Sequence, residues 1–382
     1  GDGSFTFADT VTATTVLVDD SIVTVAANKG FVGAVQNKND EGTIAFATTT
    51  QDTTLASLLL GQAANDELKA VNATVTSGTA TFGGDVFATT VTTTATDSTG
   101  SDTIAFGDKV TATTLNLDGA GAFTFADTVT AAVVISGDST STVAANVIVV
   151  GAVTNDGTTG EGTLTFAAST GDFTLASTTI GATGALLKEV NIVATDGGGA
   201  ANKASITGNV FATTVNATAT ATSSDEIEFG GTVNGTTVNL LGAGLVDFHG
   251  DVTAAVVFGA GASTTGTATV AANKKIVGAV TTATEQEIGE TTEGILTFAA
   301  ATANTTLTSS TIGTSTNALK ALNVTVTDGT ADDITVTSTL TGAVYATTVN
   351  ATATAAVAAD DGDTIAFSGA VTATTFNALG AG

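Results

Sequence analysis

The chain repeats one long pattern three times, and this repetition constrains its fold more than any other feature. The segment FTFADTVTATT at 5–15 returns as FTFADTVTAAV at 123–133 and as VDFHGDVTAAV at 246–256. Three shorter motifs recur in the same order, and their first residues in the successive copies are Val25, Val143 and Val270 for VAAN, Val32, Val150 and Val277 for VGAV, and Val86, Val210 and Val344 for V-[FY]-A-T-T-V. Such repetition is typical of a construction element rather than of a catalyst.

The copies end on a glycine motif. Copies one and two close on GAG and LGAG, and the chain itself ends on LGAG at Leu379–Gly382. The chain also lacks an initiator Met, so we expect a processed chain or part of a longer one. These boundaries predict three structural repeats, at 1–121, 122–244 and 245–382.

A shorter rhythm runs inside each copy. With the apolar residue of the x-F-x-G-x-V step as marker, Phe82 to Phe106 is 24 residues and Phe106 to Phe125 is 19. Wider gaps, 39 residues from Phe7 to Phe46 and 36 from Phe46 to Phe82, are near doubles. The sequence therefore predicts a unit of about 20 residues, repeated about six times in each copy and about eighteen times in all.

The segments around these markers have the pattern of half-buried strands. Thr103–Phe106 (TIAF) and Val110–Leu117 (VTATTLNL) alternate apolar residues with Thr, and turns such as Asp118–Gly119 follow them. We therefore predict an all-β fold, a parallel β-helix (β-solenoid) with about 20 residues per coil and the right-handed crossover that is the default. One continuous rod on the order of 85 Å follows from a spacing of roughly 4.8 Å. Three tandem β-sandwiches are the alternative, but they explain only the long repeat.

Charge and composition exclude several kinds of partner. Acidic residues number 36 against 9 basic ones, which gives a net charge of −27. Such a chain repels nucleic acid, because phosphates are bound by clusters of Lys and Arg. No segment approaches the length of apolar sequence that a transmembrane helix needs. The chain also has no Cys, which removes disulfides and thiolate metal sites.

The sequence does not predict an enzyme. His249 is the only His, and the aligned positions in the other copies hold Ala8 and Ala126. A catalytic imidazole needs a nucleophile or a carboxylate arranged around it, which a repeat position that is Ala in two copies does not provide. We interpret His249 as a surface substitution.

Calcium is the candidate cofactor. Turns rich in Gly and Asp offer the hard oxygen ligands that Ca²⁺ prefers. The candidate ligands are Asp2 near the start of the chain and Asp360, Asp361 and Asp363 near its end. The chain contains no tandem G-G-x-G-x-D nonapeptide and no EF-hand loop. Diffuse screening of the negative charge by cations is therefore the alternative.

Three Lys residues hold the same place in the three copies. Lys69, Lys188 and Lys320 each stand in an L-K-x-x-N motif, in a chain with 9 basic residues in all. One hypothesis is that each pairs with a carboxylate on a neighbouring coil or subunit. The alternative is a solvated turn Lys, whose exposed pairs stabilise little.

The motifs VTATT, VAAN and VGAV, with the S-[ST]-T-I-G…L-K-x-x-N step that is clearest at Ser309–Asn323, resemble those of secreted bacterial β-solenoids. The chain is similar to surface-layer proteins and to the passenger regions of large outer-membrane autotransporters of the rickettsial type. The resemblance spans the whole chain and carries over no functional residue. It implies export, a cell-surface location and a structural or adhesive role, with cell-surface glycans as candidate partners.

The sequence thus leads us to expect an extracellular structural protein that assembles with copies of itself into a surface layer, sheath or filament. A parallel solenoid has open strand edges at both ends, which must be capped or paired. The start, GDGSFTF, matches the interior GAGAFTF that follows copy one, so one chain can stack on the next. The predicted assembly residues are Gly1, Asp2, Phe5, Phe7, Phe376, Leu379 and Gly382. The alternative is an adhesin stalk that presents a binding domain away from the cell.

Overall fold

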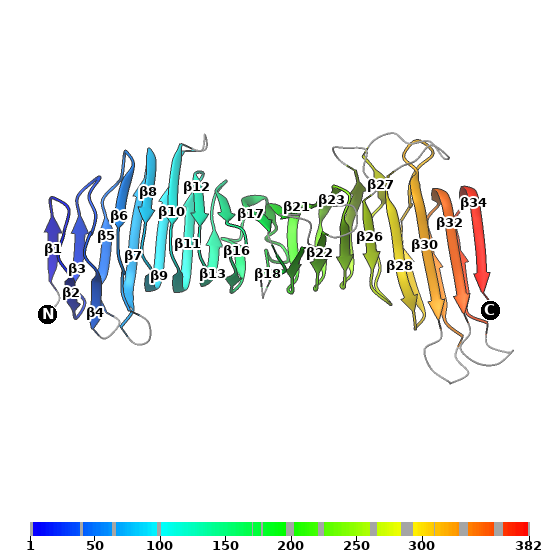
Figure 1. Cartoon of the computed structure of the whole chain (residues 1–382), viewed down its shortest axis with the longest axis horizontal. Helices are drawn as coiled ribbons and strands as arrows, with labels where there is room; N and C mark the ends of the chain where they lie inside the picture. Colours follow the sequence, from blue (N-terminus) through cyan, green and yellow to red (C-terminus); the bar gives the residue numbers. More distant parts are fainter. Residues whose placement is uncertain are drawn as a thin grey trace. The chain divides into compact units, whose positions relative to one another are not determined.

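The computed structural model describes residues 3–38, 41–62, 66–97, 101–169, 171–176, 179–195, 202–220, 225–259, 266–283, 293–308, 310–327, 335–354 and 362–380. Within this part of the chain there are 34 strands and no helix (Figure 1). The strands pair in parallel as a β-solenoid with about 24 residues per coil, as the predicted fold class requires. The coils fall into two compact units, one of 1–167 with 175–190 and one of 168–174 with 191–382.

Between residues 68 and 143 longer strands alternate with shorter ones, and the strands of the first unit have two to ten residues. They are β1 (Ser4–Phe7), β2 (Thr15–Val18), β3 (Ile22–Val25), β4 (Val35–Lys38), β5 (Thr43–Phe46), β6 (Thr53–Ala56), β7 (Leu68–Val75), β8 (Gly78–Phe82), β9 (Val86–Ala95), β10 (Asp102–Phe106), β11 (Val110–Gly119), β12 (Ala122–Phe125), β13 (Val129–Ile135), β14 (Thr140–Val143), β15 (Val149–Val150) and β16 (Val153–Asn155). Three strands contribute residues to both units, namely β17 (Glu161–Ser169), β18 (Phe173–Ala176) and β19 (Leu187–Ala194).

The second unit continues the same alternation. Its strands are β20 (Lys203–Ile206), β21 (Val210–Ala219), β22 (Glu226–Phe229), β23 (Val233–Leu241), β24 (Leu245–Phe248), β25 (Val252–Phe258), β26 (Thr267–Val270), β27 (Val280–Thr282), β28 (Ile295–Ala301), β29 (Thr305–Thr308), β30 (Leu319–Thr327), β31 (Thr337–Leu340), β32 (Val344–Thr354), β33 (Thr364–Phe367) and β34 (Val371–Gly380).

Each coil of the first unit passes through three parallel ladders of inward-facing residues. We name the ladders after one member each. The Phe5 ladder contains Phe5, Val23, Ile44, Val71, Val91, Leu115, Val133, Val153 and Ile180. The Phe31 ladder contains Val11, Phe31, Ala56, Phe82, Phe106, Phe125, Val143 and Phe166. The Val35 ladder contains Thr15, Val35, Leu60, Val86, Val110, Val129 and Val149.

The second unit also has three ladders. The Phe229 ladder contains Ile206, Phe229, Phe248, Val270, Phe298, Val324, Ala351 and Ala378. The Val233 ladder contains Val210, Val233, Val252, Ile276, Thr308, Leu340 and Phe367. The Val238 ladder contains Val215, Val238, Val256, Val280, Ile312, Val344 and Val371. Most of these side chains are buried, so stacked apolar residues form the core of each unit.

The long sequence repeat does not contain a whole number of coils. Val11 of copy one lies in the Phe31 ladder, whereas its counterpart in copy two, Val129, lies in the Val35 ladder. In the second unit, Val210 of copy two lies in the Val233 ladder, whereas its counterpart Val344 lies in the Val238 ladder. Successive copies are therefore shifted by one face of the coil. The Phe5 ladder takes five steps from Phe5 to Leu115, and the start of copy two at Phe125 lies one face further, so copy one spans about five and a third coils.

The predicted coil of about 20 residues is too short, since a coil has about 24 residues, and the predicted total of about eighteen coils is therefore too high. Phe82, Phe106 and Phe125 are neighbours in one ladder, as expected. Phe46, however, pairs with Val25 in the strand of the Phe5 ladder, whereas Phe82 lies in the Phe31 ladder. The 36 residues from Phe46 to Phe82 thus span one coil and one further face, not two coils.

Glycine is required where a copy ends. Gly119, Gly242 and Gly380 have φ values of 101°, 88° and 138°, which only glycine adopts readily. A Cβ atom on Gly119 would lie 2.2 Å from the carbonyl oxygen of Ala95 in the coil below, so the backbone needs this close approach. The same carbonyl accepts hydrogen bonds from two successive backbone N–H groups of the GAG motif, at 2.9 Å each. The repeated GAG motif is therefore a tight corner.

Candidate assembly surfaces

The junction between copies one and two shows how the start of one copy packs on the end of the previous one. Strand β12 pairs with β10, so that Phe123 lies on Ile104 and Phe125 on Phe106. The rings of Phe106 and Phe125 are stacked with centroids 5.2 Å apart and an interplanar angle of 5°. These four side chains are at most 4% exposed, so the start of copy two completes a dry core.

The next strand of copy two continues this packing. Strand β13 pairs with β11 and places Val133 on Leu115 and Ile135 on Leu117. The last residues of copy one thus form a platform for the eighth to fourteenth residues after the copy boundary. The junction uses two successive strands from each side.

The junction between copies two and three repeats this arrangement within the second unit. Strand β24 pairs with β22, and the rings of Phe229 and Phe248 stack at 5.4 Å with an angle of 8°. Strand β25 pairs with β23 and places Val256 on Val238. Because two units built from different copies give the same register, the register is a property of the repeat.

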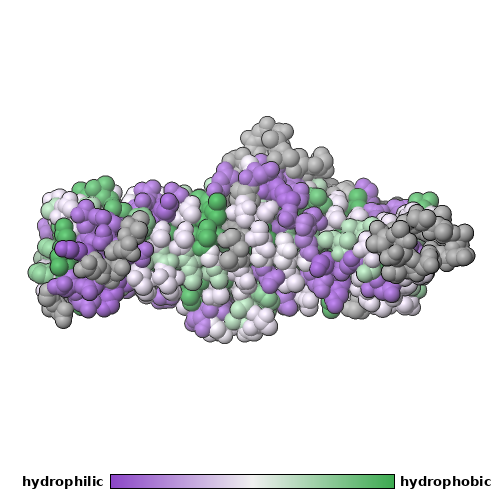
Figure 2. All heavy atoms as spheres, turned by 90° about the horizontal axis from the view of Figure 1, so that it is seen from below, coloured by the Kyte–Doolittle hydropathy of each residue, from purple (hydrophilic) through white to green (hydrophobic). Residues whose placement is uncertain are grey.

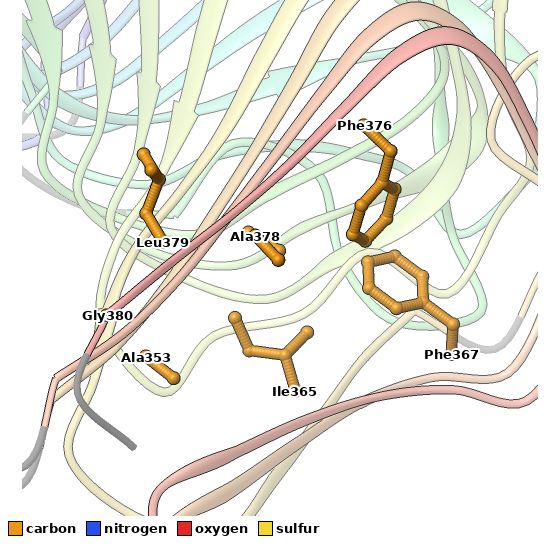
Figure 3. Close-up of a pocket in the computed structure, with 8 residues that line it drawn as sticks. Ala353, Ile365, Phe367, Phe376, Ala378, Leu379 and Gly380 are labelled. Carbon is orange, nitrogen blue, oxygen red and sulfur yellow. The ribbon is translucent and has the colours of Figure 1, made fainter.

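Strands β33 and β34 have the platform sequence without a covering copy. Their partners in the described part of the chain are β31 and β32, on one side only (Figure 1). Phe376 is 46% exposed and Leu379 is 57% exposed. Together with Ile365 and Phe367 they line an apolar pocket of about 290 Å³. Figure 3 shows the rings of Phe367 and Phe376 beside each other, and they meet edge to face at a centroid distance of 5.6 Å.

Strands β1 and β2 present the matching starting sequence at the other exposed surface. In the described residues β1 pairs with β3 and β2 with β4. Phe5 is 54% exposed, and Val16, Val18 and Ile22 are also exposed. Figure 2 shows hydrophobic residues at the surface of this end of the chain. Here a pocket of about 410 Å³ is lined by residues of β1 and β2, including Phe7.

The structure thus places Phe5 and Phe7 together on one apolar surface and Phe376 and Leu379 together on another. The other predicted assembly residues, Gly1, Asp2 and Gly382, lie outside the described residues. Four further residues of these surfaces were missed from the sequence, namely Val16, Val18, Ile365 and Phe367. The alignment of TIAF at 364–367 with TIAF at 103–106 is the signal that identifies Phe367.

Ion pairs lie on the turns beside the surface formed by β1 and β2. Lys29 Nζ lies 2.9 Å from Asp9 Oδ1, and its hydrogen bond to this carboxylate lowers the pKa of Asp9 below the ordinary 3.8. Lys69 Nζ lies 2.8 Å from Asp20 Oδ1, two coils away. Both pairs are solvent-exposed, so each contributes little to stability.

The Lys69 pair recurs in copy two, where Lys188 Nζ lies 2.9 Å from Asp138 Oδ1. This confirms the hypothesis of pairing with a nearby coil for these two residues. In copy three Gly261 stands at the sequence position of Asp20 and Asp138, so this aspartate is not repeated in the sequence. The repeated pairs therefore connect coils that are two turns apart.

Asparagine side chains form hydrogen-bonded rows on the outside of the second unit. Asn377 Nδ2 donates to Asn350 Oδ1 at 2.8 Å, and Asn350 Nδ2 donates to Asn323 Oδ1 at 2.7 Å. In copy one, Thr92 takes the middle position and accepts from Asn116 at 3.2 Å. These rows hold adjacent coils in register, and the L-K-x-x-N motif is the part of them that the sequence reveals.

Among the predicted calcium ligands, only Asp363 lies in the described part of the chain. Its side chain is 5% exposed, and Oδ1 accepts a hydrogen bond from the backbone N–H of Val336 at 3.1 Å. This contact shows a role in holding a corner of the coil. Asp2, Asp360 and Asp361 lie outside the described residues. The described residues contain no group of three or more acidic or His side chains with the spacing of a metal site.

His249 lies on an exposed turn after β24. Its Nε2 atom lies 2.9 Å from Asp247 Oδ2, and the His side chain is 47% exposed. The pair occurs in one copy only, as the sequence indicates.

No helix in the described residues is sufficiently long and apolar to span a bilayer. The chain matches no protein-family model, no curated protein and no solved structure.

Proposed function

We propose that this protein is an extracellular structural subunit that assembles with copies of itself into a surface layer, sheath or filament through contacts between β-solenoid surfaces. One observation carries the proposal. Residues that are buried at both internal junctions have exposed counterparts on two surfaces, such as Phe5 for Phe123 and Phe376 for Leu115. Exposed apolar strand edges favour pairing with another chain.

The extracellular location rests on the resemblance to secreted β-solenoids and on the acidic surface. A net charge of −27 keeps such a chain soluble and makes its association depend on ionic strength. Cell-surface glycans are proposed partners on the same resemblance.

The test is the association state of the purified chain at increasing concentration. Sedimentation velocity and negative-stain electron microscopy are carried out at low salt and at about 0.5 M NaCl, where the Debye length falls to a few ångströms. We expect regular filaments or sheets that grow with concentration and salt. Particles that stay monomeric under all of these conditions would contradict the proposal and favour a stalk.

Calcium binding is a subordinate proposal, supported by the Asp-rich turns at Asp2 and Asp360–Asp363. The test compares millimolar CaCl₂ with EDTA at constant ionic strength. A change in melting temperature or in assembly with Ca²⁺, but not with NaCl, would support a specific site. If neither quantity changes, the cations act only by screening.

A further inference from the structure

The two exposed surfaces fit each other in one register. We infer that a second copy of this chain places its β1 on β33 and its Val11 and β2 on β34, in a polar head-to-tail junction that repeats the internal ones. This inference rests on the proposed function, since it specifies the contact by which copies assemble.

The sequence alignment of the copies assigns the partners. Strand β33 (TIAF) corresponds to β10, and β34 (VTATTFNALG) corresponds to β11. Strand β1 corresponds to β12, and β2 corresponds to the second half of β13. Because β12 pairs with β10 and β13 with β11, the second copy's Phe7 lies on Phe367 and its Val16 lies on Asn377.

The shift by one face explains why the first strand of the new copy contacts the penultimate strand. At the internal junction, β12 enters the Phe31 ladder on β10, and Val133 of the next strand enters the Phe5 ladder on β11. An incoming β1 that paired with β34 directly would place Phe5 and Phe7 one face out of step. Backbone hydrogen bonding alone does not distinguish these two registers, but the apolar pattern does.

The rings at the two surfaces support the first register. Both internal junctions stack two phenylalanine rings nearly parallel, Phe106 on Phe125 and Phe229 on Phe248. Phe367 is the counterpart of the lower ring, and Phe7 is the counterpart of the upper one. Each half of the pair is present on its own surface, where Phe367 meets Phe376 and Phe7 meets the buried Phe31, in both cases at an edge.

Side-chain volumes are also complementary in this register. The internal junctions pair residues of medium size, such as Leu115 with Val133. The proposed junction pairs the large Phe376 with the small Thr15, and the small Ala378 with the large Leu17. Large residues that meet small ones let two layers interdigitate without a void. One surface thus presents a large residue followed by a small one, and the other presents a small residue followed by a large one. This order favours contact between two different surfaces over contact between two identical ones.

The junction is tested by cross-linking, because the chain contains no Cys. Two variants, Val16→Cys and Asn377→Cys, each place one thiol on the outer face of a strand, where Val16 is exposed and Asn377 is half-buried. Residues in register on paired strands lie within the distance that a disulfide bridges. Equal amounts are mixed under filament-forming conditions and oxidised, and covalent dimers are measured by non-reducing electrophoresis. We expect dimers in the mixture and none with either variant alone.

A matched control replaces Asn377→Cys by Thr372→Cys. Thr372 lies five residues before Asn377 on the same strand, so in the proposed register this variant should give no dimer with Val16→Cys. Dimers from a single variant would overturn the inference in favour of contact between identical surfaces. Filaments of both variants in the microscope without dimers in the mixture would overturn the register and leave the proposed function intact. If neither the variants nor the unmodified chain forms filaments, the proposed function fails, and the inference fails with it.

Discussion

The internal junctions and the two exposed surfaces are built from the same sequence but differ in burial. Phe123 is fully buried between coils, whereas Phe5, at the same position of copy one, is 54% exposed. Leu115 is fully buried, whereas Phe376, at the same position of copy three, is 46% exposed. Full burial of a side chain of this size contributes about 1.5–3 kcal/mol.

The comparison shows that covering by the next copy, not the sequence of the platform, separates the buried surfaces from the exposed ones. Inside the chain, each copy is stabilised by the start of the next, so the apolar face of every platform is covered. The exposed surfaces present the equivalent positions of the repeat, most of them apolar, but a covering strand is not among the described residues. Polar capping repeats normally protect such ends. Here the surfaces are apolar, which favours association over solvation.

The largest expected difference is between Phe123→Asp and Phe5→Asp. The first buries an unpaired carboxylate and deletes a core ring, so we expect a loss of at least about 3–5 kcal/mol and unfolding of the surrounding coils. The second lies on an exposed surface, so folding should be nearly unchanged while assembly is lost. Urea denaturation followed by circular dichroism measures the first effect, and sedimentation measures the second. Equal loss of folding in both variants would break the comparison.

Overpacking of one surface should weaken assembly and be reversed from the other. Ala378→Leu places a large side chain opposite Leu17 in the proposed register, and overpacking costs about 1–3 kcal/mol. We expect the critical concentration for assembly to rise by about 5- to 150-fold.

The matched rescue is Leu17→Ala in the same chain, which restores the space. Because Leu17 is buried in the first unit, the double variant is first checked for folding by its circular dichroism spectrum. A critical concentration that stays high in the folded double variant would show that the two residues do not meet.

The outer asparagine row provides a smaller effect that is separate from the core. Asn350→Asp removes the donor that bonds Asn323 and places a negative charge in the row, so we expect a loss of about 1–2 kcal/mol in the second unit. Asn350→Thr imitates Thr92 of copy one and should cost less. Urea denaturation at 0.1 M salt compares the two. Equal losses would show that the row has no energetic role.

The exposed ion pairs should have the smallest effect. A double-mutant cycle with Lys69→Met and Asp20→Asn should give a coupling energy of about 0–1 kcal/mol that decreases with salt.

The pair of Asp9 and Lys29 is tested by the dependence of stability on pH. Because the folded pKa of Asp9 is lowered, its contribution is present above pH 3.8 and is lost as the pH falls through the folded pKa. In Lys29→Met, the pKa of Asp9 measured by NMR titration should move toward 3.8.

A second pair should depend on pH in the opposite direction. Lys203 donates hydrogen bonds to Glu228 and to Glu226. Both bonds raise the pKa of Lys203 above the ordinary 10.5, and the bond to Glu228 has the larger effect. Its contribution to stability is therefore present below pH 10.5 and is lost as the pH rises through the higher folded pKa. Glu228→Gln should reduce this loss in the alkaline range, as measured by urea denaturation at pH 9 and above.

The sequence predicts the strands and the solenoid because both follow from local patterns. Alternation of Thr with apolar residues fixes which side faces the core, and the Phe82, Phe106 and Phe125 markers are true neighbours. The coil length was predicted too short because Phe46 and Phe82 resemble each other but lie in different ladders. Only the pairing of strands reveals the face shift, since corners of variable length separate the faces. The handedness of the coil stays a prediction.

The candidate site was predicted in part for a similar reason. Phe5, Phe7 and Phe376 are apolar residues near the two ends of the sequence, so their exposure follows from the repeat. Ile365 and Phe367 were missed because the exposed surface includes two strands, β33 as well as β34. Both residues lie on β33, which has a partner strand on one side only among the described residues. Recognition of this requires the coil length, which the sequence does not determine.

The most direct test of the central claim is the density at the joint between two chains in a filament, measured by cryo-electron microscopy. The account predicts that the strand ladder continues through the joint at about 4.8 Å, with Phe7 of one chain stacked on Phe367 of the other. A joint between two identical surfaces, or a filament held together only through the sides of the coils, would contradict it.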